Sequence, residues 1–176
     1  MRISDDGLLE GARFVATPNC DERPLGAQIE LIVIHNISLP PGEFGGPAIV
    51  DLFLNRLDPA AHAYYAGIAH LRVSAHFLLR RDGDIIQFVP CLQRAWHAGV
   101  SQWRDRDRCN DFSVGIELEG TDEIPFEDAQ YARLAGLIAT LKAKYPIAEV
   151  TGHSDIAPGR KTDPGPAFVW KRINSV

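Results

Sequence analysis

A short, nearly continuous apolar run, rich in β-branched residues, does most to restrict the folds open to this chain. The run covers residues 29–34 and ends at His35. An apolar segment of this length without polar alternation is typical of a strand that is buried on both faces of a sheet. Ligand-binding groups collect at the carboxyl ends of strands in open α/β sheets, so His35 is a candidate functional residue.

Further strands are predicted downstream. Residues 73–80 and 84–89 flank an Asp-Gly dipeptide, which is a strong signal for a β-hairpin. Residues 114–119 alternate strictly, with apolar side chains on one face and two glutamates on the other. Residues 148–150 are predicted to form a last short strand. Together with the first run, these segments predict a mixed sheet of four to five strands.

One long helix and one or two shorter helices are expected around this sheet. Between residues 127 and 145, apolar residues recur at steps of three and four and define one helical face. Segment 40–47 is too rich in proline and glycine for a helix or a central strand, but Pro47 suits the first position of a helix that runs to about residue 56. Pro166 is expected to open a short final helix.

The fold class expected from these elements is α/β (α+β), with a central mixed β-sheet flanked by helices. At 176 residues the chain is long enough for one domain with its own core. No internal repeat, low-complexity segment or linker divides it. We therefore expect a single domain over residues 1–176, with an irregular lead-in over about residues 1–28 that contains one helical turn.

Composition excludes several classes of partner. The formal net charge is −5 and no dense basic stripe is present, so the footprint of a nucleic-acid-binding protein is missing. No apolar run is long enough to span a bilayer, and the first residues carry acidic side chains without the apolar segment of a secretory signal. The three cysteines form no CxxC pair, which suits a reducing compartment. We expect a cytoplasmic protein without a membrane or nucleic-acid partner.

The loop over residues 151–166 carries the densest group of candidate chemical residues. It contains His153, Lys161 and Asp163, and it is stiffened by proline and glycine. Two histidines and one carboxylate form the protein half of a catalytic zinc site, so His35, His153 and Asp163 are candidate Zn²⁺ ligands if they meet in space. The chain contains no HExxH motif, and each of its six histidines taken singly is more often structural.

The remaining chemistry of such a hydrolase needs a carboxylate and a cation. A carboxylate takes a proton from water and passes it to the departing nitrogen, and Glu117 and Glu119 are both candidates. Two glutamates on one strand are also typical of a solvated face, so the residues alone leave this choice open. Lys161 is suited to stabilise negative charge on a carbonyl oxygen.

Two arginines and one aromatic segment are candidates for substrate contacts. Arg72 and Arg108 have guanidinium groups that bind carboxylates in a bidentate manner, although surface arginines and internal ion pairs are the commoner alternative. The segment 96–99 offers a tryptophan face for a sugar, or else places that tryptophan in the core.

Five segments resemble one family of enzymes, the zinc N-acetylmuramoyl-L-alanine amidases that include phage T7-type lysozyme and the peptidoglycan recognition proteins. These segments cover residues 33–46, 67–76, 94–101, 109–120 and 151–166. The resemblance extends from about Leu8 to Trp170 and is strongest to the cytosolic members that act on anhydro-muropeptides.

The resemblance implies a role for each candidate. It implies one Zn²⁺ on His35, His153 and Asp163, with Glu117 and Lys161 as catalytic residues. It also implies, less directly, recognition of the peptide stem and sugar by the residues Asn36, Arg72 and Arg108. The implied substrate is a small soluble muropeptide, and we expect a monomer.

The implied reaction is hydrolysis of the amide between anhydro-N-acetylmuramic acid and L-alanine of the stem peptide. It would serve cell-wall recycling and repression of inducible β-lactamase. An alternative from the same superfamily is a module that binds wall fragments without cutting them. A third alternative, a regulatory partner of a polymerase, has no supporting feature in the sequence.

Overall fold

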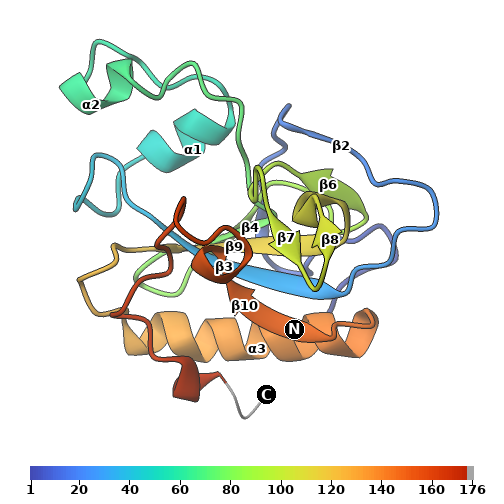
Figure 1. Cartoon of the computed structure of the whole chain (residues 1–176). Coiled ribbons are helices and arrows are strands. Elements are labelled where there is room, and N and C mark those ends of the chain that lie inside the picture. Colours follow the sequence, from blue (N-terminus) through green and yellow to red (C-terminus); the bar gives the residue numbers. More distant parts are fainter. Residues whose placement is uncertain (174–176) are drawn as a thin grey trace.

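A six-stranded mixed sheet forms the centre of the computed structural model, which describes residues 1–173 (Figure 1). Along the sheet the strands are β1 (Arg13–Phe14), β5 (Ile85–Gln87), β4 (Phe77–Leu79), β9 (Ser113–Glu119), β3 (Leu31–Ile37) and β10 (Glu149–Gly152). The β4–β5 pair is the predicted antiparallel hairpin, and every other neighbouring pair is parallel.

Helices lie on both faces of this sheet (Figure 1). The long helix α3 (Asp128–Lys144) covers one face, and α1 (Ala48–Phe53) and α2 (Ala63–Ala66) lie on the other side. The four-residue helix α4 (His153–Ile156) directly follows β10. Short 3₁₀ turns occupy Cys109–Asp111 and Trp170–Arg172. The predicted mixed sheet flanked by helices is therefore confirmed.

Two further sheets of two strands each lie beside the central sheet. The first pairs β2 (Cys20–Glu22) with β6 (Gln93–Ala95), and the second pairs β7 (Gln102–Trp103) with β8 (Arg106–Asp107); both pairs are antiparallel.

Alternation along the central strands decides which face of the sheet carries chemistry. On β3, Ile32 and Ile34 pack with the α3 residues Leu134 and Ile138 in one continuous core. Burying an aliphatic side chain of this size contributes roughly 1.5–3 kcal/mol, so this face is strongly determined. Because successive side chains point to opposite faces, His35 lies on the face away from α3.

The same alternation holds on β9. Val114, Ile116 and Leu118 join the α3 core, which leaves Gly115 and Glu117 on the opposite face. In the parallel β3–β9 ladder, His35 is the register partner of Glu117. The two candidate residues therefore lie side by side on the face away from α3.

The β3–β10 register brings in the third element. Gly152, the last residue of β10, pairs with Ile34, so His153 follows at the level of His35. Parallel strands end at the same edge of a sheet, and three neighbouring strands thus deliver His35, Glu117 and His153 to one place.

Some expectations from the sequence are wrong in detail. The sheet has six strands rather than four or five, because Arg13–Phe14 adds an edge strand that is too short to show a period. The predicted irregular lead-in also contains β2 and an Ile3–Leu9 bridge, and it has no helical turn. The final helix is a 3₁₀ turn that begins at Trp170 rather than Pro166, since turns occupy the intervening residues. The last three residues of the predicted domain lie outside the described part of the chain.

None of the helices in residues 1–173 has the length and apolar character needed to cross a lipid bilayer.

Candidate metal centre and active site

Three of the predicted residues converge on one point. His35 Nδ1 lies 2.9 Å from His153 Nδ1, and each of these nitrogens lies 3.0 Å from Asp163 Oδ2. The histidines are buried and the aspartate is half-buried. His35 comes from β3, His153 opens α4, and Asp163 lies ten residues further along the same loop. The structure thus brings together the three candidate metal ligands.

The hydrogen bonds around His153 determine which of its ring nitrogens carries the proton and which one directs a lone pair toward His35 and Asp163. Its Nε2 lies 3.1 Å from the carbonyl oxygen of Ala98, which can only accept a hydrogen bond. Nε2 therefore carries the proton in the neutral ring, and Nδ1 presents a lone pair toward Asp163. Orientation of a ligating histidine by a backbone carbonyl on its other nitrogen is common around metals.

Burial lowers the pKa of the His35 ring to about 4, which favours the neutral ring that a metal ligand needs. A carboxylate and imidazole nitrogens are ligands that zinc prefers, and around a tetrahedral ion they stand about 3.3 Å apart. Mutual distances of 2.9 to 3.0 Å are close to that spacing. The residues present therefore fit a Zn²⁺ ion by their chemistry and by their convergence.

The ligand loop is held by its own side chains. Asp155 Oδ2 accepts hydrogen bonds from Thr151 Oγ1 at 3.0 Å and from the backbone N–H of Gly152 at 2.8 Å. These contacts tie the end of β10 to the first turn of α4, and they fix the backbone that carries His153. The Ser154 N–H donates to the Asp163 carbonyl at 2.9 Å, which closes the loop on itself.

Glu117 faces the same cavity as the three candidate ligands. The cavity has a volume of about 440 Å³ and is lined by all of them together with Glu117, Lys161 and Trp96. Glu117 Oε2 is buried without a hydrogen-bond partner in the described chain. Burial raises the pKa of Glu117 well above its ordinary value, Asp163 raises it further, and Lys161 opposes the shift. Such a carboxylate is a stronger base than an exposed glutamate.

Glu119 has a different environment, although the sequence left it as an alternative to Glu117. Its carboxylate forms an ion pair with Arg80 at 2.7 Å and accepts the N–H of Gly45 at 2.7 Å. It is absent from the lining of the cavity that holds the three candidate ligands. Glu119 therefore anchors the proline- and glycine-rich loop after β3, and Glu117 is the one of the two carboxylates that faces the candidate ligands.

The two catalytic candidates in the cavity differ in exposure. Lys161 is exposed, whereas the Glu117 Oε2 atom is shielded from solvent. An exposed ammonium at the cavity wall is free to meet a ligand that enters from solvent, while the Glu117 Oε2 atom is buried and has no hydrogen-bond partner in the described chain.

Asn36 lines the cavity, but its amide is already engaged. Its Nδ2 donates to Asp122 Oδ1 at 2.7 Å and to the carbonyl oxygen of Pro164 at 3.1 Å. Since Pro164 follows Asp163, the second bond holds the segment that carries a candidate ligand.

The two arginines predicted to bind substrate are not brought to the cavity wall. Arg72 is exposed and donates to the carbonyl oxygens of its neighbours His70 and Leu71. Arg108 is 70% exposed and contacts Asp111 at 3.3 Å. Neither lines the cavity, and their roles stay predictions.

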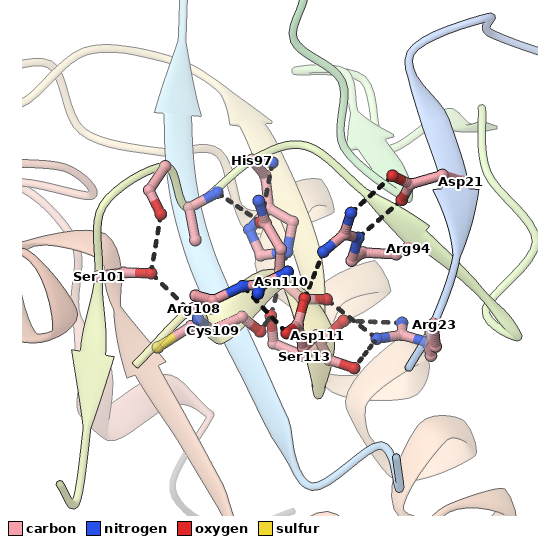
Figure 2. Close-up of polar contacts among 12 residues, drawn as sticks. Asp21, Arg23, Arg94, His97, Ser101, Arg108, Cys109, Asn110, Asp111 and Ser113 are labelled. Atoms are coloured by element: carbon pink, nitrogen blue, oxygen red, sulfur yellow. Dashed lines mark hydrogen bonds and ion pairs between the residues drawn. The ribbon is translucent and has the colours of Figure 1, made fainter. Parts of the chain in front are cut away.

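The structure adds one residue group that the sequence reasoning missed. Asn110 Oδ1 accepts the N–H groups of His97 at 3.1 Å and Ala98 at 2.8 Å (Figure 2). It thereby holds the backbone whose carbonyl orients His153. The 3₁₀ turn that carries Asn110 is itself fixed by Arg94, which bridges Asp21 and Asp111 (Figure 2). No pattern of spacing indicates these contacts, because each joins residues of different elements or loops that only the folded chain brings together.

A comparison with known protein families shows which family this chain belongs to. The model of the N-acetylmuramoyl-L-alanine amidase family matches residues 25–166. The chain belongs to this family. Both the resemblance read from the five motifs and the enzyme class, an amidase, are confirmed.

Two AmpD enzymes are similar to this amidase over nearly all of its length and most of their own. The 1,6-anhydro-N-acetylmuramyl-L-alanine amidase AmpD of Escherichia coli strain K12 is 61% identical over 173 residues, which cover 97% of this chain and 94% of the relative. The enzyme of the same name from Citrobacter freundii is 58% identical over 176 residues, with 99% and 94% covered.

Solved structures agree with this relationship. A crystal structure of a selenomethionine derivative of AmpD is 60% identical to this amidase, covers 97% of both chains and superposes with a TM-score of 0.95. The amidase AmiD of E. coli was solved in complex with the substrate anhydro-N-acetylmuramic acid-L-Ala-D-γ-Glu-L-Lys. It is 32% identical, covers 88% of this chain and 60% of its own, and has a TM-score of 0.61.

Proposed function

We propose that this amidase hydrolyses the amide bond between anhydro-N-acetylmuramic acid and the L-alanine of the stem peptide, with one Zn²⁺ held by His35, His153 and Asp163. The observation that carries the proposal is the convergence of Nδ1, Nδ1 and Oδ2 within 3.0 Å of one another at a cavity that also contains Glu117. The full-length similarity to AmpD enzymes supports the choice of substrate.

A bound Zn²⁺ would supply Lewis-acid polarisation and would make water acidic enough to be a nucleophile at neutral pH. The chain's own residues supply the proton transfer. Glu117, with its raised pKa and its Oε2 free of other partners, takes the proton from the attacking water and returns it to the departing amide nitrogen. Such transfer typically contributes ~100- to 10,000-fold to the rate.

Lys161 stabilises the charge that develops on the carbonyl oxygen. Its ammonium lines the cavity near Glu117 and Asp163, and a preplaced cation is most effective where a developing charge is shielded from water. The apolar part of the lining, which includes Ile68 and Trp96, offers a surface on which the sugar ring can pack. For Asn36, Arg72 and Arg108, we keep the proposal that they contact the substrate.

The finer biological setting is proposed with the reaction. Cleavage of soluble anhydro-muropeptides by a monomer in the cytoplasm would recycle wall fragments, and it would remove the fragments that induce β-lactamase. One domain over residues 1–176 carries this activity.

Mass spectrometry of a purified anhydro-muramoyl tripeptide incubated with the protein tests the proposal. Release of free tripeptide and free anhydro sugar is the expected result. A fragment that is bound but recovered intact would contradict the proposed hydrolysis and would favour the alternative of a binding module.

A further inference from the structure

A row of polar contacts leads away from the candidate metal ligand His35. His35 Nε2 lies 2.9 Å from His97 Nδ1, and the other ring nitrogen of His97 lies 3.1 Å from Ser113 Oγ. Ser113 Oγ in turn lies 2.6 Å from the carbonyl oxygen of Cys109. The row therefore runs from the metal site to a backbone carbonyl of the 3₁₀ turn shown in Figure 2.

The carbonyl of Cys109 sets the direction of every hydrogen bond in this row. A carbonyl oxygen only accepts, so the hydroxyl proton of Ser113 points at Cys109. Ser113 Oγ must then accept from His97, which requires the proton of the neutral His97 ring to be on Nε2. His97 Nδ1 is left as an acceptor, and His35 donates to it through its own Nε2–H. The remaining nitrogen of His35, Nδ1, is thereby left as a lone pair that faces His153 and Asp163.

The fold makes room for this row at a cost in β-sheet formation. Gly115 lies under the His97 ring, and a Cβ atom at position 115 would be 2.4 Å from His97 Cγ. Glycine weakens a strand interior and often marks the close approach of another group. Ser113, two residues earlier on β9, is fully buried, so no water competes for its hydroxyl.

We propose that His97 and Ser113 are positioning residues, which hold His35 in the Nε2–H tautomer and so present its Nδ1 to the metal. The Ala98 carbonyl does the same for His153, and Asn110 holds the backbone of both His97 and Ala98 (Figure 2). The inference rests on the proposed metal site. It concerns two residues that are not among the three candidate ligands. His97 lines the cavity, whereas Ser113 does not.

Nuclear magnetic resonance of protein labelled with ¹⁵N-histidine reads the tautomers directly. Long-range ¹H–¹⁵N correlation spectra of the metal-free and the zinc-loaded chain are expected to show Nε2–H for both His35 and His97, with assignments from a His97→Phe variant. The two measurements test different hypotheses. If the wild-type chain binds no zinc, the proposed function is contradicted. If the metal-free spectrum shows an Nδ1–H tautomer at His97, the proposed positioning role of His97 and Ser113 is contradicted.

Ser113→Ala removes one oxygen atom from the row without touching a metal ligand. We expect His97 to lose its preference for Nε2–H, and the dissociation constant for zinc, measured by chelator competition, to rise about 10- to 100-fold. His97→Phe is expected to weaken zinc binding to a similar extent, and Ser113→Thr, which restores the hydroxyl, to recover both the tautomer and the affinity.

Ser101→Ala is the matched control. Ser101 is a buried serine in the same region (Figure 2), and its hydroxyl bonds Gly99 and Cys109 but not His97. We expect its zinc dissociation constant to stay within about twofold of the wild type. The inference requires both effects in Ser113→Ala. An unchanged zinc affinity, or a weaker affinity with unchanged tautomers, would overturn it, and His97→Phe decides the matter if Ser113→Ala fails to fold.

Discussion

The side-chain amide of Asn36 lies 2.7 Å from the carboxylate of Asp122, and the same amide reaches the Pro164 carbonyl at 3.1 Å. Asn36 follows His35 on β3, and Pro164 follows Asp163. One amide group therefore ties together the chain segments that carry the candidate ligands His35 and Asp163. The segment after β9 is joined to them as well, because the Ala167 N–H donates to the Asp122 carbonyl at 2.9 Å.

This contact predicts that Asn36→Ala weakens zinc binding. Loss of the amide frees the Asp163–Pro164 segment, and outer contacts of this kind typically change metal affinity ~10- to 100-fold. Chelator competition on the purified variant measures the zinc dissociation constant. If Asn36 acted on substrate alone, KM would rise while the zinc affinity stayed at the wild-type value, and that pattern would contradict the structural role.

Glu117→Gln is predicted to keep zinc and lose turnover. The amide has nearly the shape of the carboxylate but cannot take a proton, so kcat should fall ~100- to 10,000-fold. Steady-state kinetics, together with the zinc content from mass spectrometry, measure both quantities. A decrease below threefold with full zinc occupancy would remove Glu117 from the role of acid and base.

Glu119→Ala is predicted to lower the stability of the fold while the folded protein keeps its turnover. It leaves Arg80, which is 13% exposed, without its ion-pair partner and releases the Gly45 N–H. Removing one partner of a buried ion pair costs about 3 kcal/mol of unfolding free energy. Urea unfolding measures this loss. Turnover by the folded fraction should remain far above that of Glu117→Gln, and equal losses of turnover in the two variants would contradict the assignment.

Acid is predicted to destabilise the metal-free chain through its buried neutral histidines. Burial lowers the pKa of His76 to about 3, whereas an unfolded histidine has a pKa of about 6.5. Between these values the unfolded state binds a proton that the folded state does not. The unfolding free energy therefore falls as the pH drops, by about 1.4 kcal/mol per pH unit for each such residue.

The His76→Gln variant isolates this contribution. Glu117 acts in the opposite sense because burial raises its pKa, but it is present in both proteins and cancels in the comparison. Denaturant unfolding between pH 6.5 and pH 4 should give the variant a shallower dependence on pH by about 1.4 kcal/mol per unit. Equal slopes in the variant and the wild type would show that His76 titrates normally in the folded protein.

Local patterns were sufficient to predict the main elements. The apolar run before His35, the Asp-Gly hairpin, the alternating strand with Glu117 and the periodic helix α3 all occur within a few residues of their predicted bounds. In each of these elements the apolar residues that define the sequence pattern are also the residues buried in the core. The short strands β6 and β7 were not predicted, because segments of two or three residues have no measurable period. The equally short β4 and β5 were predicted because the Asp-Gly turn between them marks the hairpin.

The candidate site was predictable only as a set of residue types. Nothing in the spacing of His35 and His153 shows that β3 and β10 are parallel neighbours, and that register is what brings the two rings together. The choice between Glu117 and Glu119 likewise depends on Arg80, which binds the second glutamate from another strand end. The role of His97 follows from Gly115 and Ser113 on β9, and is visible only once the loop lies over that strand.

The proposed zinc dependence is tested by titrating the metal-free chain with zinc and measuring bound metal and the rate of muropeptide cleavage on the same samples. We expect cleavage to be absent without metal, to rise with zinc and to saturate at one ion per chain. We also expect Asp163→Ala, with its fold verified by circular dichroism, to show neither binding nor cleavage. Full cleavage by the zinc-free protein, or by Asp163→Ala without bound zinc, would contradict the claim.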